Sequence, residues 1–131
     1  YLTTNLERND TSGFAKIGGG MANDTGVFTF PTTGYWSVYF QINTNVVYGG
    51  HVTENAYIWY TADDWSSQSV ASQNSGYGYY SEAQELTVSS MFYITDTTNQ
   101  QVKFGRYSPK TTTVEASTNE NITFVNFIRH G

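Results

Sequence analysis

A regular alternation of side chains runs through residues 35–42 and predicts a β-strand with two distinct faces. In a strand, alternate residues point to the same face of the sheet. One face is wholly apolar and is expected to lie on a core: Trp36, Val38, Phe40 and Ile42. The other face consists of Tyr35, Ser37, Tyr39 and Gln41. It carries two aromatic residues, which a face exposed only to solvent does not need. A strand that is apolar on both faces is typically buried on both faces.

Similar patterns recur along the chain and predict an all-β fold of about eight to ten strands. Pro31 and Gly34 interrupt the first strong pattern and predict a corner between two strands. Further strands are expected at residues 14–17, 27–30, 56–62, 84–96, 101–107, 111–117 and 122–130. Residues 63–81 are rich in Ser, Gly and Tyr, which predicts a long loop or a loosely formed hairpin. Parallel strands need crossover helices, and no helical pattern is present, so an antiparallel sandwich is predicted.

The composition agrees with this fold class. The chain has 131 residues, which suits one domain over residues 1–131, with residues 1–13 expected to lead in from an upstream region. It contains 11 Tyr, 8 Phe and 3 Trp, which fit a pleated and half-buried surface. It contains no Cys, so disulfides and thiolate metal sites are excluded.

The charge and hydropathy exclude two classes of partner. The net charge is −5, and the six basic residues form no cluster, so nucleic-acid binding is not expected. No apolar run approaches the roughly 20 residues that span a bilayer, so membrane insertion is not expected either. The chain begins at Tyr1, and we therefore expect a processed or excised domain.

Several motifs in order resemble one family. The first is a run of spaced positions: Gly26, Phe28, Phe30, Pro31, Gly34, Tyr35 and Phe40. The strand-turn-strand pattern of residues 86–104 and the closing segment TFVNFI (residues 123–128) follow it. Together they resemble C1q/TNF-like jelly-roll domains, the globular heads of the first complement component and their tumour-necrosis-factor-like relatives. Asn126 stands where that family usually has Gly, and residues 63–81 have no counterpart in it.

The resemblance implies a jelly-roll sandwich that assembles as a tight homotrimer, with one sheet of each protomer buried against its neighbours. The residues that it places in the interface are Tyr35, Tyr39, Val125 and Phe127. A second small core under a loop is the alternative for these side chains. The segments LERNDTSGFAKIGGGM and GVFTFPTTG are also similar to modules at the ends of bacteriophage fibres.

Aromatic residues among Ser, Gly and Asn predict a ligand-binding surface in and beside residues 63–81. Tyr and Trp supply large rigid contact area, small polar residues adapt their hydrogen bonds, and sugar rings stack on such aromatics. The candidates are Trp65, Tyr77, Tyr79 and Tyr80, with Tyr48 and His51 from the preceding loop. The alternative is a polar loop whose tyrosines pack on the trimer neighbour.

No catalytic motif is found. His51 and His130 lie in no nucleophile motif, so the chain is not expected to be an enzyme. Calcium prefers six to eight oxygen ligands, and loop acids at Asp63, Asp64, Asp96 and Asp24 are its candidates. Solvated turn acids are the alternative, and no other cofactor is expected.

These patterns lead to one expected function and two alternatives. The expected function is a trimeric virion protein at the tip of a phage fibre or appendage, recognising a host-surface glycan or protein receptor. The first alternative is a purely structural capsid-decorating or trimerising cap. The second is a secreted, extracellular C1q-like domain for adhesion or signalling.

Overall fold

The computed structural model describes residues 1–3, 19–47, 50–79, 82–117 and 122–131. Within these ranges it contains nine β-strands and no helix, and every strand pair is antiparallel. The predicted all-β antiparallel sandwich is therefore confirmed. The strand expected at residues 14–17 lies outside the described residues, and no membrane-spanning helix occurs within them.

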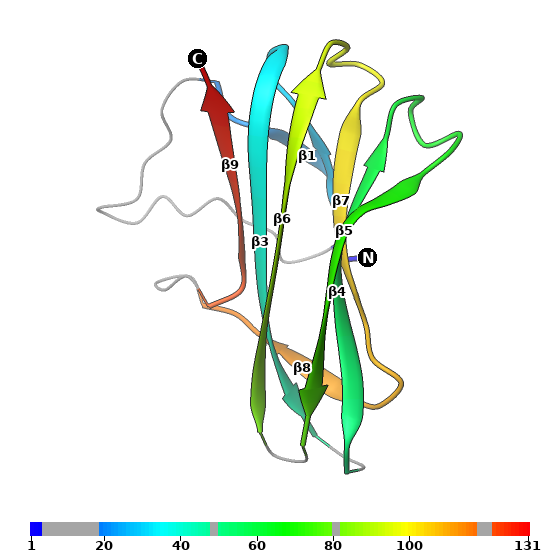
Figure 1. The fold of residues 1–131 in the computed structure, drawn as a ribbon, viewed down its shortest axis with the longest axis vertical. Helices are drawn as coiled ribbons and strands as arrows, with labels where there is room; N and C mark the ends of the chain where they lie inside the picture. Colours follow the sequence, from blue (N-terminus) through cyan, green and yellow to red (C-terminus); the bar gives the residue numbers. More distant parts are fainter. Residues whose placement is uncertain (4–18, 48–49, 80–81, 118–121) are drawn as a thin grey trace.

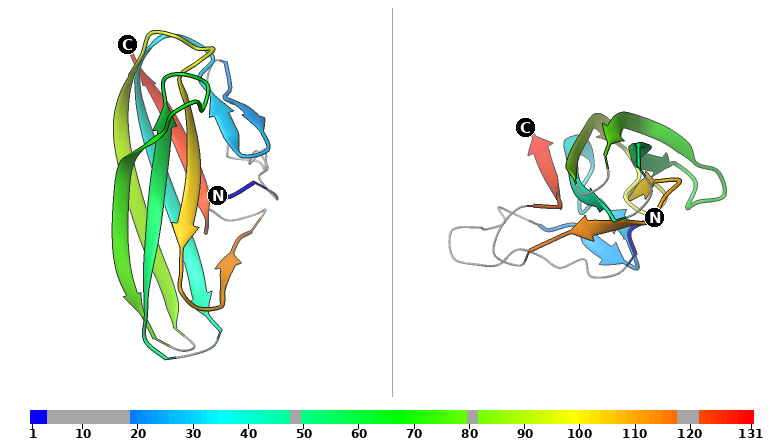
Figure 2. Two further views of the ribbon diagram at one scale, coloured as in Figure 1. Left: turned by 90° about the vertical axis from the view of Figure 1, so that its right-hand side faces the viewer. Right: turned by 90° about the horizontal axis from the view of Figure 1, so that it is seen from below.

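The strands form two sheets that run along the length of the molecule (Figures 1 and 2). The five-stranded sheet has the spatial order β1 (Ala22–Asp24), β2 (Val27–Thr29), β7 (Gln101–Tyr107), β4 (Val52–Thr61) and β5 (Ser69–Gly78). In the four-stranded sheet, β6 (Ala83–Ile94) pairs with β3 (Gly34–Val46). The other edge of β3 pairs first with β9 (Phe124–His130) and then with β8 (Thr112–Glu115).

The corner at Pro31 and Gly34 carries the chain from one sheet to the other. β2 belongs to the five-stranded sheet, and β3, directly after the corner, is the central strand of the four-stranded sheet. Gly34 has a φ of 125°, a conformation that residues with a side chain rarely adopt. The Trp36 indole nitrogen donates a hydrogen bond of 3.0 Å to the carbonyl of Thr32 and closes the corner.

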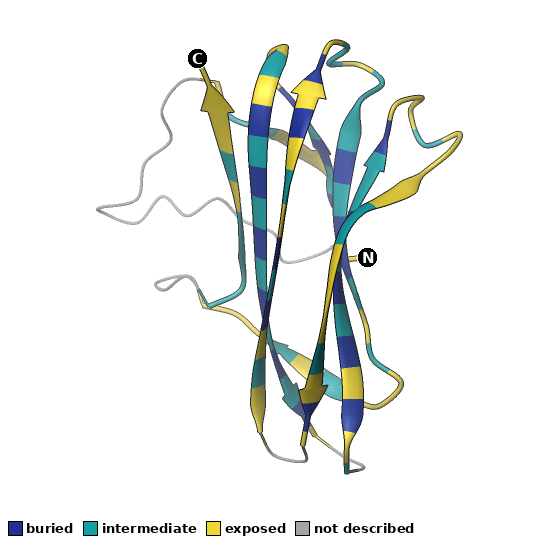
Figure 3. Ribbon diagram, viewed as in Figure 1, coloured by how far each residue is buried: buried dark blue, intermediate teal, exposed yellow. Residues whose placement is uncertain are grey.

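The core lies between the two sheets and is built on alternate residues of each long strand (Figure 3). All four inward residues of β3 that the alternation predicts are buried: Trp36, Val38, Phe40 and Ile42. The Phe104 ring from β7 packs on Phe40 and Phe28, with ring centroids 5.2 and 5.3 Å apart. Rings from both sheets therefore meet in one continuous core.

Residues 63–81, expected to form a long loop or a loosely formed hairpin, contain a strand. Ten of them form β5, which pairs with β4 from Val52↔Gly78 to Tyr60↔Ser69. β5 is an edge strand, and most of its side chains are partly or fully exposed. Ser, Gln and Asn have low strand propensity, so the backbone pairing to β4 is what places these residues in a strand. The long-loop alternative is therefore wrong, and the hairpin alternative is closer, although the partner strand β4 lies outside residues 63–81 and composition does not reveal this pairing.

One carboxylate lies inside the sandwich. The alternation of β4 turns Glu54 inward, and its side chain is only 2% exposed. Thr44 donates a hydrogen bond to Oε2, while Oε1 lies 3.7 Å from Nη1 of Arg106. No described residue donates a hydrogen bond to Oε1, so within this part of the chain Arg106 compensates its charge through an ion pair alone. Removing one partner of a buried ion pair leaves a costly isolated charge.

We expect Arg106→Met to lower the free energy of unfolding by about 3 kcal/mol, because Glu54 would lose the one cation that pairs with it among the described residues. Lys110→Met is the control, since it removes an exposed charge and should cost less than about 0.5 kcal/mol. Urea denaturation at one fixed protein concentration measures both variants. Equal losses would contradict the compensating role of Arg106.

Candidate functional site

Four large apolar side chains form a patch on the outward face of the four-stranded sheet. Their exposed fractions are high: Tyr35 53%, Met91 64%, Tyr93 59% and Ile128 49%. The register makes them neighbours, because Tyr35 lies opposite Tyr93 and Ser37 lies between Met91 and Ile128. The rings of Tyr35 and Tyr93 stack with centroids 4.6 Å apart. We call this group the Tyr35 patch.

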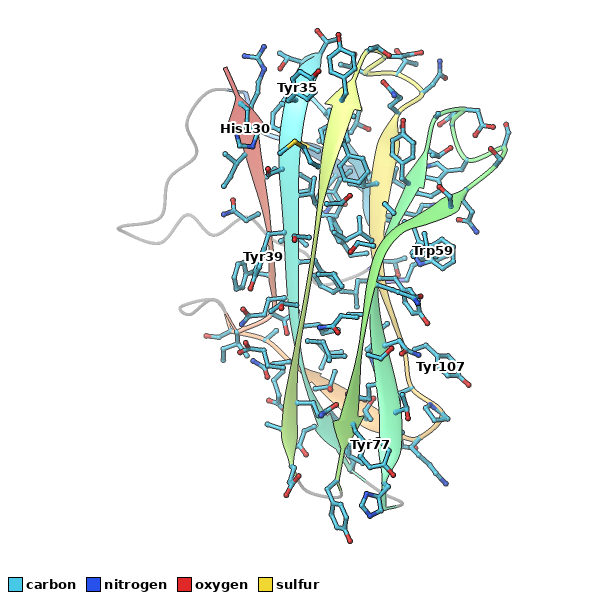
Figure 4. All side chains as sticks on the ribbon, viewed as in Figure 1. Tyr35, Tyr39, Trp59, Tyr77, Tyr107 and His130 are labelled. Atoms are coloured by element: carbon cyan, nitrogen blue, oxygen red, sulfur yellow. The ribbon has the colours of Figure 1, made fainter. Side chains whose placement is uncertain are left out.

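The outward direction predicted for Tyr35 and Tyr39 matches the structure (Figure 4). Tyr39 is half-buried and continues the patch along β3, with its ring 5.6 Å from that of Phe124 on β9. Gln41 accepts a hydrogen bond of 3.2 Å from the Tyr39 hydroxyl. The outward face therefore changes from apolar at Tyr35 to polar beyond Tyr39.

The positions predicted for Val125 and Phe127 need correction, because both side chains face the core. The register places Val125 opposite Phe40 and Phe127 opposite Val38, on the inward side of β3. The Phe127 ring lies 5.4 Å from Phe28 and 5.9 Å from Phe104. Both faces of β9 carry apolar residues, so the sequence did not reveal which face points inward. The outward apolar residues of β9 are Phe124 and Ile128.

A serine and a histidine also meet on the outward face. Ser37 Oγ lies 2.6 Å from His130 Nε2, within the reach of a nucleophile and its base. Both side chains lie on an open sheet surface, and no carboxylate among the described residues orients the His130 ring. This pair therefore has neither the cleft nor the third group of a catalytic triad.

The structure brings together three of the predicted ligand-binding residues. His51 packs edge-on against Tyr79, with ring centroids 4.1 Å apart, and lies 5.2 Å from Tyr77. These rings gather at the end of the sandwich where β4 begins and β5 ends. Tyr48 and Tyr80, the other two candidates there, lie outside the described residues.

Trp65 lies at the opposite end of the β4–β5 pair and does not join this cluster. Its indole nitrogen donates a hydrogen bond of 2.6 Å to Gln101, and its backbone nitrogen donates one of 3.0 Å to the Thr61 hydroxyl. Nζ of Lys103 lies 3.7 Å from the centre of its ring. The predicted single surface containing both Trp65 and Tyr77 is therefore not formed within one chain.

Two of the four carboxylates proposed for calcium, Asp63 and Asp96, accept hydrogen bonds within their own turns, while Asp24 ends β1. Hydrogen bonds from the side chain and backbone of Ser67 lower the pKa of Asp63. Those from the Asn99 side chain and the Thr98 backbone likewise lower the pKa of Asp96. Asp64 lies beside Asp63 with a φ of 51°. Among the described residues, no three His, Cys, Asp or Glu side chains are placed to hold a metal ion.

A second aromatic group lies on the outward face of the five-stranded sheet, on the side away from the Tyr35 patch (Figure 4). Tyr57 and Trp59 alternate with buried Ala56 and Ile58 on β4, with their rings 5.7 Å apart. Tyr107 lies on the neighbouring strand β7 and is largely exposed. The sequence analysis missed this group, although residues 56–59 carry the same alternation that drew attention to Tyr35 and Tyr39.

We expect Phe127→Ala to lower the free energy of unfolding by about 3 kcal/mol, because the ring packs on three core phenylalanines. Asn126→Ala, the exposed neighbour, is the control and should change it by less than about 0.5 kcal/mol. Guanidinium denaturation compares them. A small loss for Phe127→Ala would show that β9 faces the other way.

The two turn carboxylates also predict a pH dependence. Each has a pKa below its ordinary value of 3.8 in the folded chain. Their contribution to stability is therefore complete above the unfolded pKa and is lost as the pH falls through the folded pKa. Thermal unfolding should show a midpoint that declines below about pH 4, and Asp63→Asn should reduce that decline. Asp64→Asn is the control, because no described residue donates a hydrogen bond to the Asp64 carboxylate. An unchanged decline in Asp63→Asn would contradict this role.

Comparison of the chain with known proteins assigns it to no family. No protein-family model matches the chain, and no curated protein matches it either. The function proposed below therefore depends on the chemistry and geometry of the surfaces themselves, together with the resemblance of the sequence motifs.

Proposed function

We propose that this chain is a non-enzymatic binding module that assembles as a homotrimer through the outward face of its four-stranded sheet. The observation that carries this proposal is the Tyr35 patch, which exposes four adjacent large apolar side chains on a regular sheet. Contiguous exposed apolar patches mark interaction surfaces in folded domains. A second copy of the same chain is the partner that the family resemblance favours.

The path of the chain supports a C1q/TNF-like jelly roll as the finer description of the fold. β2, β4, β5 and β7 lie in the five-stranded sheet, whereas β3, β6 and β9 lie in the four-stranded sheet. The chain thus crosses repeatedly between the sheets, as it does in jelly rolls. The family resemblance implies that one sheet faces the threefold axis, and the Tyr35 patch makes the four-stranded sheet the better candidate.

The proposed place of the module is the tip of a bacteriophage fibre or appendage, on the surface of the virion, where it recognises a host-surface molecule such as a glycan. Three equivalent sites on one rigid trimer would gain avidity from weak individual contacts. Exposed aromatic residues outside the Tyr35 patch, among them Tyr77, Tyr79 and Tyr107, favour recognition over a purely structural cap. Such a cap has no need of aromatic side chains turned away from its neighbours.

We expect the wild-type chain to sediment as a trimer and Tyr35→Lys to sediment as a monomer at the same micromolar concentration. The substitution would place an unpaired charge in the buried centre of the interface. Lys lowers the magnitude of the net charge of −5, so dissociation would not reflect greater overall repulsion.

Tyr77→Lys is the matched control, because Tyr77 is 65% exposed on the five-stranded sheet and should leave the trimer intact. Sedimentation velocity measures all three proteins. A monomeric wild-type protein at micromolar concentration would overturn the proposed assembly.

A further inference from the structure

We infer that the outward face of the five-stranded sheet binds the pyranose ring of an acidic glycan on a platform formed by Tyr57, Trp59 and Tyr107, with Lys103 at its edge. This inference rests on the proposed recognition of a host-surface glycan and assigns that recognition to a particular site. The site differs from the predicted cluster around His51 and Tyr77.

The platform is a group of adjacent rings on two neighbouring strands. The rings of Tyr57 and Trp59 are inclined by only 36°, so their faces turn in similar directions. Tyr57 lies opposite Gly105, and Tyr1 packs over this glycine, with Cδ1 3.6 Å from where a Cβ would stand. The Tyr1 ring, itself 56% exposed, meets the Trp59 ring edge-on with centroids 6.0 Å apart and so borders the platform. A Cβ at Gly105 would lie 3.6 Å from Nε1 of Trp59. Tyr107 follows two residues later on the same face of β7.

The polar groups of the platform have no hydrogen-bond partner in the part of the chain that the structure describes. Among the described residues, no acceptor receives a hydrogen bond from the Trp59 indole nitrogen, and the hydroxyls of Tyr57 and Tyr107 have no partner. Tyr and Trp combine an apolar ring with a polar group that seeks a hydrogen bond. A pyranose ring has the complementary chemistry, since it joins an apolar face of C–H groups to a rim of hydroxyls.

The charge at the edge of the platform selects an acidic sugar. Lys103 lies directly opposite Trp59 across the β4–β7 pair, and its Nζ lies 3.7 Å from the Trp65 ring centre and 5.3 Å from that of Tyr1. No carboxylate among the described residues forms an ion pair with it, although acids outnumber bases in the chain. An uncompensated ammonium beside a stacking ring is complementary to a carboxylate on the bound sugar.

The surroundings leave room for more than one sugar residue and keep the site open in the assembly. A hollow of about 420 Å³, open to solvent, adjoins the platform at Tyr107 and is also lined by Tyr1. Trp59 and Tyr107 project away from the side that carries Tyr35, Tyr39 and His130 (Figure 4). A trimer formed through the Tyr35 patch would therefore leave three platforms facing outward.

An array of immobilised oligosaccharides tests the inference, with each neutral member paired with a counterpart that carries a uronic acid or a sialic acid. We expect the wild-type protein to bind carboxylate-bearing members in preference to neutral ones. Trp59→Ala should weaken binding by about tenfold or more, because the central ring is lost. Trp59→Phe keeps an apolar ring but loses the indole donor, and its binding should be weaker than that of the wild-type protein and stronger than that of Trp59→Ala. Lys103→Gln should abolish the preference for acidic members and retain weak binding.

Val47→Ala is the control and should bind as the wild-type protein does, since Val47 is an exposed apolar residue that belongs to neither proposed site. Tyr77→Ala tests the cluster around His51 at the far end of β5 as the alternative site. Circular dichroism and sedimentation of every variant show that fold and assembly are retained. Unchanged binding by Trp59→Ala together with a loss in Tyr77→Ala would overturn the inference in favour of the His51 cluster. A wild-type protein that binds no member of the array would overturn it as well, while the proposed trimer would still be judged by sedimentation alone.

Discussion

Burial of the inward face of β3 is the constraint on which the rest of this structure depends. β3 pairs with three other strands, and its inward residues meet rings from the facing sheet. The corner at Gly34, the partners of β3 and the direction of β9 are all consistent with placing these residues in the core. The apolar surface removed from water here is the main favourable contribution to folding.

A strand that buries one face must present its alternate residues to the other side, and this rule creates both candidate surfaces. On β3 it turns Tyr35 and Tyr39 outward from the four-stranded sheet. On β4 it turns Tyr57 and Trp59 outward from the five-stranded sheet. The two surfaces lie on opposite sides of one core, so one can associate with copies of the chain while the other remains open.

Strand alternation also places a charged side chain inside the sandwich, which is energetically unfavourable unless it is compensated. Alternation along β4 places Glu54 in the core, where Thr44 and Arg106 are its compensating partners. At the turns, the carboxylates of Asp63 and Asp96 instead accept hydrogen bonds from neighbouring residues. Local geometry thus gives these two acids a structural role in their turns.

The sequence by itself determined the fold class and the outward direction of Tyr35 and Tyr39, because strand alternation is a local property that one segment displays completely. It also located most of the strands within a few residues. Only the tertiary structure decided that Ser69–Gly78 is a strand, that Val125 and Phe127 point inward, and that Trp65 lies far from His51. These depend on which strand pairs with which and in what register. Such pairing joins residues distant in the chain, and no local pattern records it.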